Sequence, residues 1–163
     1  MRVALLSDIH DNITHLLLAL HTAEQHGCTH LLFMGDMTAA STFRTLREEW
    51  PHPIDLVFGN NEYELNAFSR IAEASANTRL HGTAANIELD KRRLFFTHLP
   101  RDAYKTAEAG NHDAVFYGHT HTQEIRTIGS TLVVNPGEIY GRNGVPSIGI
   151  YDTLTNSASI IRI

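Results

Sequence analysis

The sequence contains a single cysteine, Cys28, which excludes an intramolecular disulfide. It has no apolar run of the roughly 20 residues that a membrane-spanning helix needs. The apolar run that begins at Val3 stops at Ser7 and is too short for a secretory signal peptide. Positive charge is also scarce: 13 Lys and Arg against 18 Asp and Glu give a net charge of −5, which argues against binding to duplex nucleic acid. We expect a cytoplasmic protein with no membrane partner.

The remaining composition is ordinary for a globular protein. Of 163 residues, 42% are hydrophobic and 19% charged, which suits one domain over residues 1–163. Histidine is the exception, with 11 residues. Seven of them lie on a helical segment or near the ends of predicted elements, where an ordinary surface role is the simpler interpretation: His15, His21, His26, His30, His52, His81 and His112. The other four histidines follow apolar strands.

The first half of the chain alternates short apolar runs with helical patterns. We predict strands at 2–6, 30–34 and 54–58, and helices at 12–26, 42–50 and 62–76. Asn12 is a suitable N-cap for the first helix, and Gly27 closes it. This alternation indicates a parallel sheet with helices packed on it.

The second half is richer in strands. Residues 83–89 and 92–97 flank Asp90 and Lys91 and predict a β-hairpin. A short helix at 101–109 precedes predicted strands at 114–117, 124–128, 131–134, 147–152 and 157–163. The fold class expected from the pattern is α/β, with α+β character in the C-terminal half.

Five of the predicted strands end in polar residues of the same kinds. These residues are Asp8-Ile9-His10, Asp36, Asn60-Asn61-Glu62, His98 and His119-Thr120-His121. In open α/β sheets, ligands bind outside the carboxyl ends of the strands, so these side chains are expected to converge. Glycines precede Asp36, Asn60 and His119, and they allow sharp turns and close backbone approach.

The spacing and chemistry of these residues favour a metal site. Asp8 and His10 are two residues apart, so in an extended segment both side chains would point the same way, and His119 and His121 repeat this spacing. Imidazole, carboxylate and amide ligands without thiolate suit Mn, Fe, Ni, Co or Zn. Seven ligands are too many for one tetrahedral ion but suit two ions that share a carboxylate, for which Asp36 is the natural bridge.

Taken singly, each of these residues has a simpler explanation. Asp8 could be an acid at a helix N-terminus, and Asp36 and Asn60 could belong to turns or caps. Glu62 could support Asn60 or start a helix. The joint placement of all of them after strands favours the metal site.

The ordered motifs resemble those of the calcineurin-like metallophosphoesterases, and the chain length and the Asn135-Pro136-Gly137 segment are similar to the small YfcE-like phosphodiesterase branch. The resemblance implies a four-layer αββα sandwich of two mixed sheets flanked by helices. It assigns one metal ion to Asp8, His10, Asp36 and His121, and the other to Asp36, Asn60, His98 and His119. A bridging hydroxide would attack phosphorus in line, and Mn is the first expectation for the two divalent ions.

Two positions depart from this family's pattern. Many members have a histidine where this chain has Asn61, and an amide can donate a hydrogen bond but cannot supply a proton. After His98 many members continue Gly-His, whereas this chain has Leu99-Pro100. We expect Asn61, Asp36 and His119 to carry catalysis, with a preference for diesters over monoesters.

The substrate and partners are less defined. The expected substrate is a small phosphate ester: a cyclic nucleotide, a nucleotide-derived diester or a phosphomonoester. Arg101, Lys105 and Arg142 could reach its phosphate, although solvated charge is the simpler role. A homo-oligomer is possible. The alternative function is a catalytically weak, Vps29-like protein-interaction scaffold on the same fold, against which the complete ligand set argues.

Overall fold

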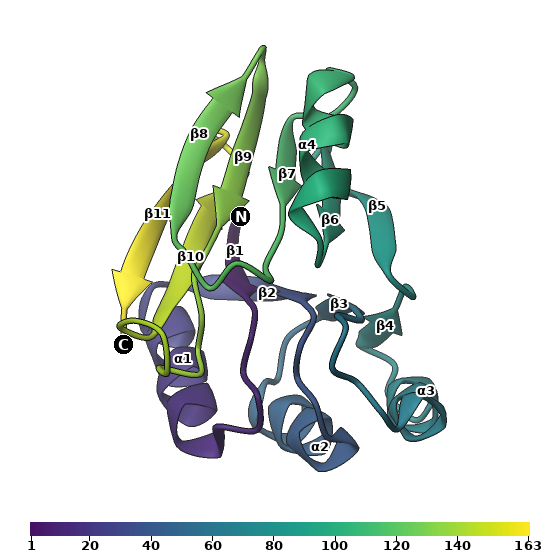
Figure 1. Ribbon diagram of the computed structural model, residues 1–163. Helices are drawn as coiled ribbons and strands as arrows, with labels where there is room; N and C mark the ends of the chain where they lie inside the picture. Colours follow the sequence, from purple (N-terminus) through teal and green to yellow (C-terminus); the bar gives the residue numbers. More distant parts are fainter.

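The computed structural model describes residues 1–163 and contains two sheets that pack face to face (Figure 1). The first sheet has the strand order β11-β10-β1-β2-β3-β4. Its strands are β1 (Arg2–Leu6), β2 (Cys28–Met34), β3 (Ile54–Val57), β4 (Thr78–Leu80), β10 (Ser147–Asp152) and β11 (Ser157–Arg162). Strands β1 to β4 run parallel, and the β10–β11 hairpin joins the sheet antiparallel to β1.

The second sheet has the order β5-β6-β7-β9-β8. Its strands are β5 (Ala84–Leu89), β6 (Arg92–Thr97), β7 (Ala114–Phe116), β8 (Glu124–Ile128) and β9 (Thr131–Asn135). Strands β6, β7 and β9 are parallel, while β5 and β8 pair antiparallel at the two edges. Both sheets are therefore mixed.

Four helices cover the outer faces of the two sheets, which confirms the expected αββα sandwich (Figure 1). Helices α1 (Ile13–Gln25), α2 (Ala40–Glu49) and α3 (Leu65–Glu73) pack on the first sheet, and α4 (Pro100–Glu108) packs on the second. None of these helices combines the length and the apolar character that crossing a membrane requires.

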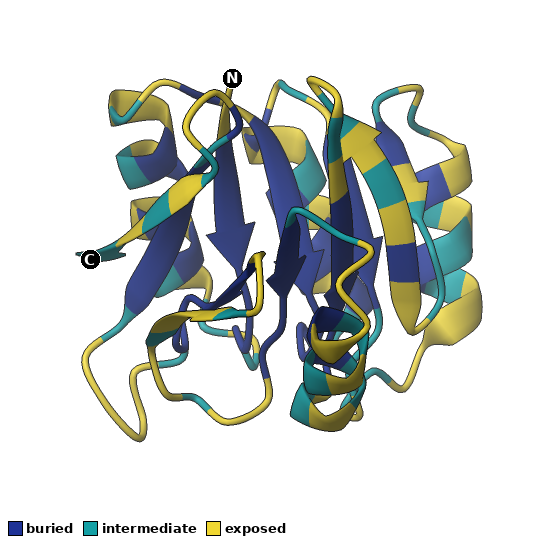
Figure 2. Cartoon of the chain, turned by 90° about the horizontal axis from the view of Figure 1, so that it is seen from above, coloured by how far each residue is buried: buried dark blue, intermediate teal, exposed yellow.

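Three apolar clusters fill the spaces between the layers. Phe43 and Trp50 lie between the helices and the first sheet, Leu32 and Phe96 lie between the two sheets, and Val115 packs under α4. The central strands are buried, and the helices expose their outer sides (Figure 2). Each large buried side chain contributes about 1.5–3 kcal/mol to folding. These cores hold the strand ends at one edge of the molecule.

Local signals account for two of the element boundaries. The Asn12 side chain accepts the backbone N–H of His15 and caps α1, as predicted. Asp90 and Lys91 have φ of 48° and 66°, as a two-residue hairpin turn requires.

One strand was missed, and the boundaries of one helix were wrong. Strand β4 was not predicted, because three residues carry too little pattern and its pairing with β3 places it. The third helix begins at Leu65 instead of residue 62, because the Glu62 carboxylate binds the backbone N–H groups of Met37 and Gly59. This contact supports the loop that carries Asn60, which is the first of the two roles that the sequence suggested for Glu62.

Candidate metal centre

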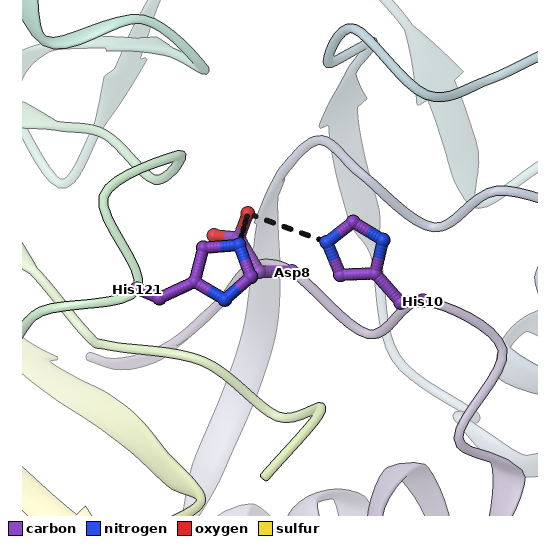
Figure 3. Close-up of side chains that lie close together, drawn as sticks. All are labelled: Asp8, His10 and His121. Carbon is purple, nitrogen blue, oxygen red and sulfur yellow. Dashed lines mark ion pairs between the residues drawn. The ribbon is translucent and has the colours of Figure 1, made fainter. Parts of the chain in front are cut away.

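The loops that follow β1, β2, β3, β6 and β7 bring all seven predicted metal ligands into one cluster. Part of it, here called the Asp8 group, consists of Asp8, His10 and His121, whose ligand atoms lie within 4.8 Å of one another. Asp8 Oδ1 is 3.3 Å from His121 Nε2 and 4.0 Å from His10 Nε2. Figure 3 shows both rings presenting a nitrogen to the carboxylate. A carboxylate oxygen and two imidazole nitrogens thus face one small volume.

A second part, here called the Asp36 group, consists of Asp36, Asn60, His98 and His119. Asp36 Oδ2 is 3.4 Å from His98 Nε2. His98 Nε2 in turn lies 3.0 Å from Asn60 Oδ1 and 3.2 Å from His119 Nδ1. Because Asp36 Oδ2 is also 3.6 Å from His10 Nε2, this carboxylate stands between the two groups.

The backbone at these ligands is in an unusual conformation. Five of the seven have φ in the left-handed region: Asp8 (55°), His10 (44°), Asp36 (60°), His119 (68°) and His121 (59°). The expectation that Asp8 and His10 converge because they lie in an extended segment was therefore wrong, and the same holds for the other histidine pair. The side chains converge because the chain turns sharply at each of them. Such conformations cost about 1–3 kcal/mol each and cluster at functional sites.

Close backbone approach explains two of the glycines that precede the ligands. A Cβ on Gly35 would lie 2.5 Å from the backbone nitrogen of Gly59. A Cβ on Gly59 would overlap the Asp36 carboxylate. The two loops pack so tightly that only hydrogen fits at these positions, which confirms the sequence-based expectation of close approach.

Two buried polar atoms of the Asp8 group lack partners. Asp8 is fully buried, and its Oδ1 atom and His10 Nε2 accept or donate no hydrogen bond. Burial raises the pKa of Asp8, because a charged carboxylate in this position is poorly compensated. A divalent cation between Asp8, His10 and His121 would supply the missing partner, and so the residues present fit a metal ion.

Asp36 is in a different electrostatic environment. Burial would raise its pKa, but hydrogen bonding and charge from His98, with hydrogen bonds from Asn61 and Asn60, lower the pKa well below the usual value. Its Oδ1 accepts the backbone N–H groups of Asn60 and Asn61, and its Oδ2 accepts the Asn61 side-chain amide at 2.6 Å. Asp36 is therefore an ionised carboxylate held in one orientation.

A cavity of about 480 Å³ opens over the cluster. Its walls are formed by His10, Asp36, Asn60, Asn61, His119, His121, Tyr140, Arg142 and Asn143. Arg142 is the only Lys or Arg side chain among them, whereas Arg101 and Lys105 lie outside the cavity. None of the seven other histidines lines it.

Some residues around the centre were not singled out by sequence reasoning. Glu138, which is 1% exposed, contacts His121, and the ring of Tyr140 lies 5.1 Å from the ring of His10. The one available signal was that both follow the Asn135-Pro136-Gly137 segment, which makes a tight turn at the end of β9. His15, treated as peripheral, hydrogen-bonds the carbonyl of Ile139 and supports this segment.

Comparisons with known proteins define the class. The sequence model of the calcineurin-like phosphoesterase superfamily domain matches residues 1–156, and the chain belongs to this family of phosphate-ester hydrolases, which use divalent metal ions. Within it, the chain is similar to Phosphodiesterase MJ0936 of Methanocaldococcus jannaschii, with 26% identity over 94% of this chain and 93% of that protein.

Two solved structures share the fold of this chain. The structure of a novel archaeal phosphodiesterase matches with a TM-score of 0.88 and 25% identity over 100% of both chains. YfcE, a phosphoesterase from E. coli, matches with a TM-score of 0.69 and 21% identity, again over 100% of both chains, and shares the fold.

Proposed function

We propose that this protein is a phosphodiesterase that works with two divalent metal ions. The observation that carries the proposal is the position of Asp36, whose Oδ2 atom lies 3.6 Å from His10 Nε2 and 3.4 Å from His98 Nε2. One carboxylate oxygen thus faces ligand atoms of both groups. A carboxylate shared in this way suits a two-metal site.

The proposed ligands divide according to these contacts. One ion would be held by Asp8, His10, Asp36 and His121, and the other by Asp36, Asn60, His98 and His119. When bound, such a pair lowers the pKa of a water molecule for in-line attack at phosphorus and stabilises charge on the phosphoryl oxygens. The nitrogen and oxygen ligands suit Mn first, with Ni, Fe, Co and Zn also compatible.

The chain's own residues orient the substrate. Asn61 and Arg142 line the cavity beside the ligands. Arg142 places a permanent positive charge where a phosphate group enters, which favours an anionic ester. The backbone of His119 is held beside Asp8, because its N–H donates to Asp8 Oδ2 at 3.0 Å.

Asn61 supports a preference for diesters. Its amide donates to Asp36, and it cannot supply a proton to a leaving group or present an extra cation to a monoester dianion. A small diester with a good leaving group is therefore the substrate that the site accommodates best.

The test combines metal content with turnover. Elemental analysis and anomalous scattering should find two ions per chain, and Asp36 should contact both. An aryl phosphodiester should be hydrolysed with Mn and not after treatment with a chelator. A single ion, with Asp36 in contact with only one site, would contradict the proposal. Binding of metal without turnover would favour the Vps29-like scaffold instead.

A further inference from the structure

Glu138 uses both of its carboxylate oxygens in contacts that join two parts of the site. The side chain is buried, and Glu138 is not among the seven proposed metal ligands. Its Oε2 atom is 2.5 Å from Nδ1 of His121. Its Oε1 atom accepts the backbone N–H groups of Asn143 at 2.6 Å and Gly144 at 2.8 Å. Because both oxygens are engaged, Glu138 contacts the proposed ligand His121 without acting as a ligand.

Glu138 is the nearer of two partners of His121 Nδ1, since the Asn143 side-chain amide lies 3.3 Å from the same atom, and the Glu138 contact determines which ring nitrogen can bind a metal. A carboxylate accepts hydrogen bonds, so it holds the proton on Nδ1 and leaves the lone pair on Nε2. Nε2 is the atom that faces Asp8 Oδ1, at 3.3 Å. A carboxylate behind a ligating histidine orients the ring and raises its basicity, and losing such a partner typically weakens metal binding about 10–100-fold.

The other oxygen holds the loop that faces the substrate. Residues 138–147 form a loop, here called the Arg142 loop, whose two ends are joined because the backbone N–H of Ser147 donates to the Glu138 carbonyl at 2.9 Å. Within this loop, Arg142 and Asn143 line the cavity, and Tyr140 lies against His10. The N–H groups bound by Glu138 belong to the two residues that directly follow Arg142. The carboxylate therefore holds the backbone beside Arg142, which is the only Lys or Arg that lines the cavity.

We infer that Glu138 is a positioning residue, which sets His121 for metal binding and holds the Arg142 loop over the same metal site. This inference rests on the proposed function, because it takes His121 as a ligand. A metal ion bound at the Asp8 group and a substrate held by Arg142 are then coupled through one carboxylate. Removing the carboxylate weakens one of the two metal sites selectively.

The substitution Glu138→Gln separates the two roles. The glutamine oxygen has to face the N–H groups of Asn143 and Gly144, because an amide NH₂ there would meet two donors. The NH₂ group then faces His121 and donates to Nδ1, which moves the ring proton to Nε2. The loop contacts survive, while the nitrogen that faces Asp8 loses its lone pair.

The experiment titrates metal-free wild type and Glu138→Gln with Mn²⁺ by calorimetry, and records the ring nitrogens of His121 by ¹⁵N NMR of the metal-free proteins above the pH at which imidazole is protonated. We expect Glu138→Gln to weaken one of two sites about 10–100-fold, to leave the other within about 3-fold, and to change the His121 tautomer from Nδ1–H to Nε2–H.

Two matched variants serve as controls. Glu124→Gln also replaces a carboxylate that accepts two side-chain hydrogen bonds, from Tyr104 and Tyr117, but it contacts no histidine, so both Mn²⁺ affinities should equal those of wild type. Arg142→Ala should raise KM and leave both affinities unchanged.

Each outcome decides the inference. If both Mn²⁺ affinities of Glu138→Gln equalled those of wild type, Glu138 would have no role in metal binding and the inference would be overturned. An equal loss of Mn²⁺ affinity at both sites would also overturn it, because such a loss would indicate a general structural role. An unchanged tautomer would also overturn it. If wild type itself bound a single ion and hydrolysed no diester, the proposed function would fail, while the NMR result would still report on the contact between Glu138 and His121.

Discussion

The substitution Gly35→Ala tests whether the close packing of two loops holds the candidate metal centre together. Gly35 directly precedes Asp36 and has a φ of +88°. A Cβ there would lie 2.5 Å from the nitrogen and 2.6 Å from the Cα of Gly59, and 2.9 Å from His98 Nδ1. Backbone atoms cannot yield as the end of a flexible side chain can, so the Gly59 loop or the His98 ring has to move.

The chain contains a matched control at Gly82. Its φ of +78° is nearly the same, but a Cβ would have no neighbour within 4 Å. Gly82→Ala should therefore lower the free energy of unfolding only by the cost of the left-handed conformation, about 1–2 kcal/mol. Gly35→Ala bears this cost and that of overpacking, which is typically about 1–3 kcal/mol, so its total is about 2–5 kcal/mol. Subtracting one from the other isolates the contact between the loops.

The assay is urea unfolding of both metal-free variants and wild type, followed by Mn²⁺ titration of each folded protein. Gly35→Ala should be less stable than Gly82→Ala by about 1–3 kcal/mol and should bind Mn²⁺ more weakly, because Asn60 and His98 are displaced. Gly82→Ala should bind Mn²⁺ as wild type does. Equal destabilisation, or an unchanged Mn²⁺ affinity in Gly35→Ala, would show that the loops can separate at no cost and would refute the reasoning.

Three further predictions follow from individual contacts. Asp36→Ala should abolish hydrolysis of an aryl phosphodiester and lower the metal content at both sites, whereas His112→Ala, which lies outside the cavity, should retain turnover; similar losses in the two variants would contradict the assignment. Asp55 is buried, which would raise its pKa, but hydrogen bonds from His30 and His81 lower the pKa to about 2. Because the folded pKa lies below the unfolded value of about 3.9, the carboxylate stabilises the fold by about 2 kcal/mol above pH 4, and this contribution is lost as the pH falls towards 2. Urea unfolding from pH 7 to pH 2 should thus show a smaller acid-induced loss in Asp55→Asn than in wild type, and parallel curves would rule the contribution out. Asn61→His should flatten the dependence of kcat/KM on leaving-group pKa in a series of aryl esters and raise monoesterase relative to diesterase activity, since a proton donor contributes about 10²–10⁴-fold; identical slopes would show that Asn61 does not set the preference.

Much of the architecture could be predicted because its signals are local. The apolar run before Asp8 and the one before Asp36 are short enough to be strands and end in polar residues, and the Asn12 cap marks the first helix. The hairpin at Asp90 follows from turn chemistry alone. Strand β4 could not be predicted, because its three residues become a strand by pairing with β3.

The same distinction applies to the candidate metal centre. The residue types and their order after successive strands were sufficient to name seven candidate ligands and the family, because strand ends in a parallel arrangement meet at one edge. How the ligands meet was decided by the tertiary structure. The left-handed backbone at Asp8 and His10, for example, accompanies hydrogen bonds from their backbone N–H groups to the carbonyls of Gly35 and Asp36 in the neighbouring loop.

Glu138 shows the limit most clearly. Nothing near it in the sequence indicates that a glutamate after a tight turn touches a histidine 17 residues away and two amides farther along the chain. The contact with His121 exists because β7 pairs with β9, which brings the end of β9 beside the loop after β7. The contacts with the two amides form because the chain folds back on Glu138, where the backbone N–H of Ser147 closes the loop. The sequence by itself determined which chemistry the chain can perform, since ligand types are local properties. Tertiary packing decided which residues orient those ligands, because such contacts form only between segments that fold side by side.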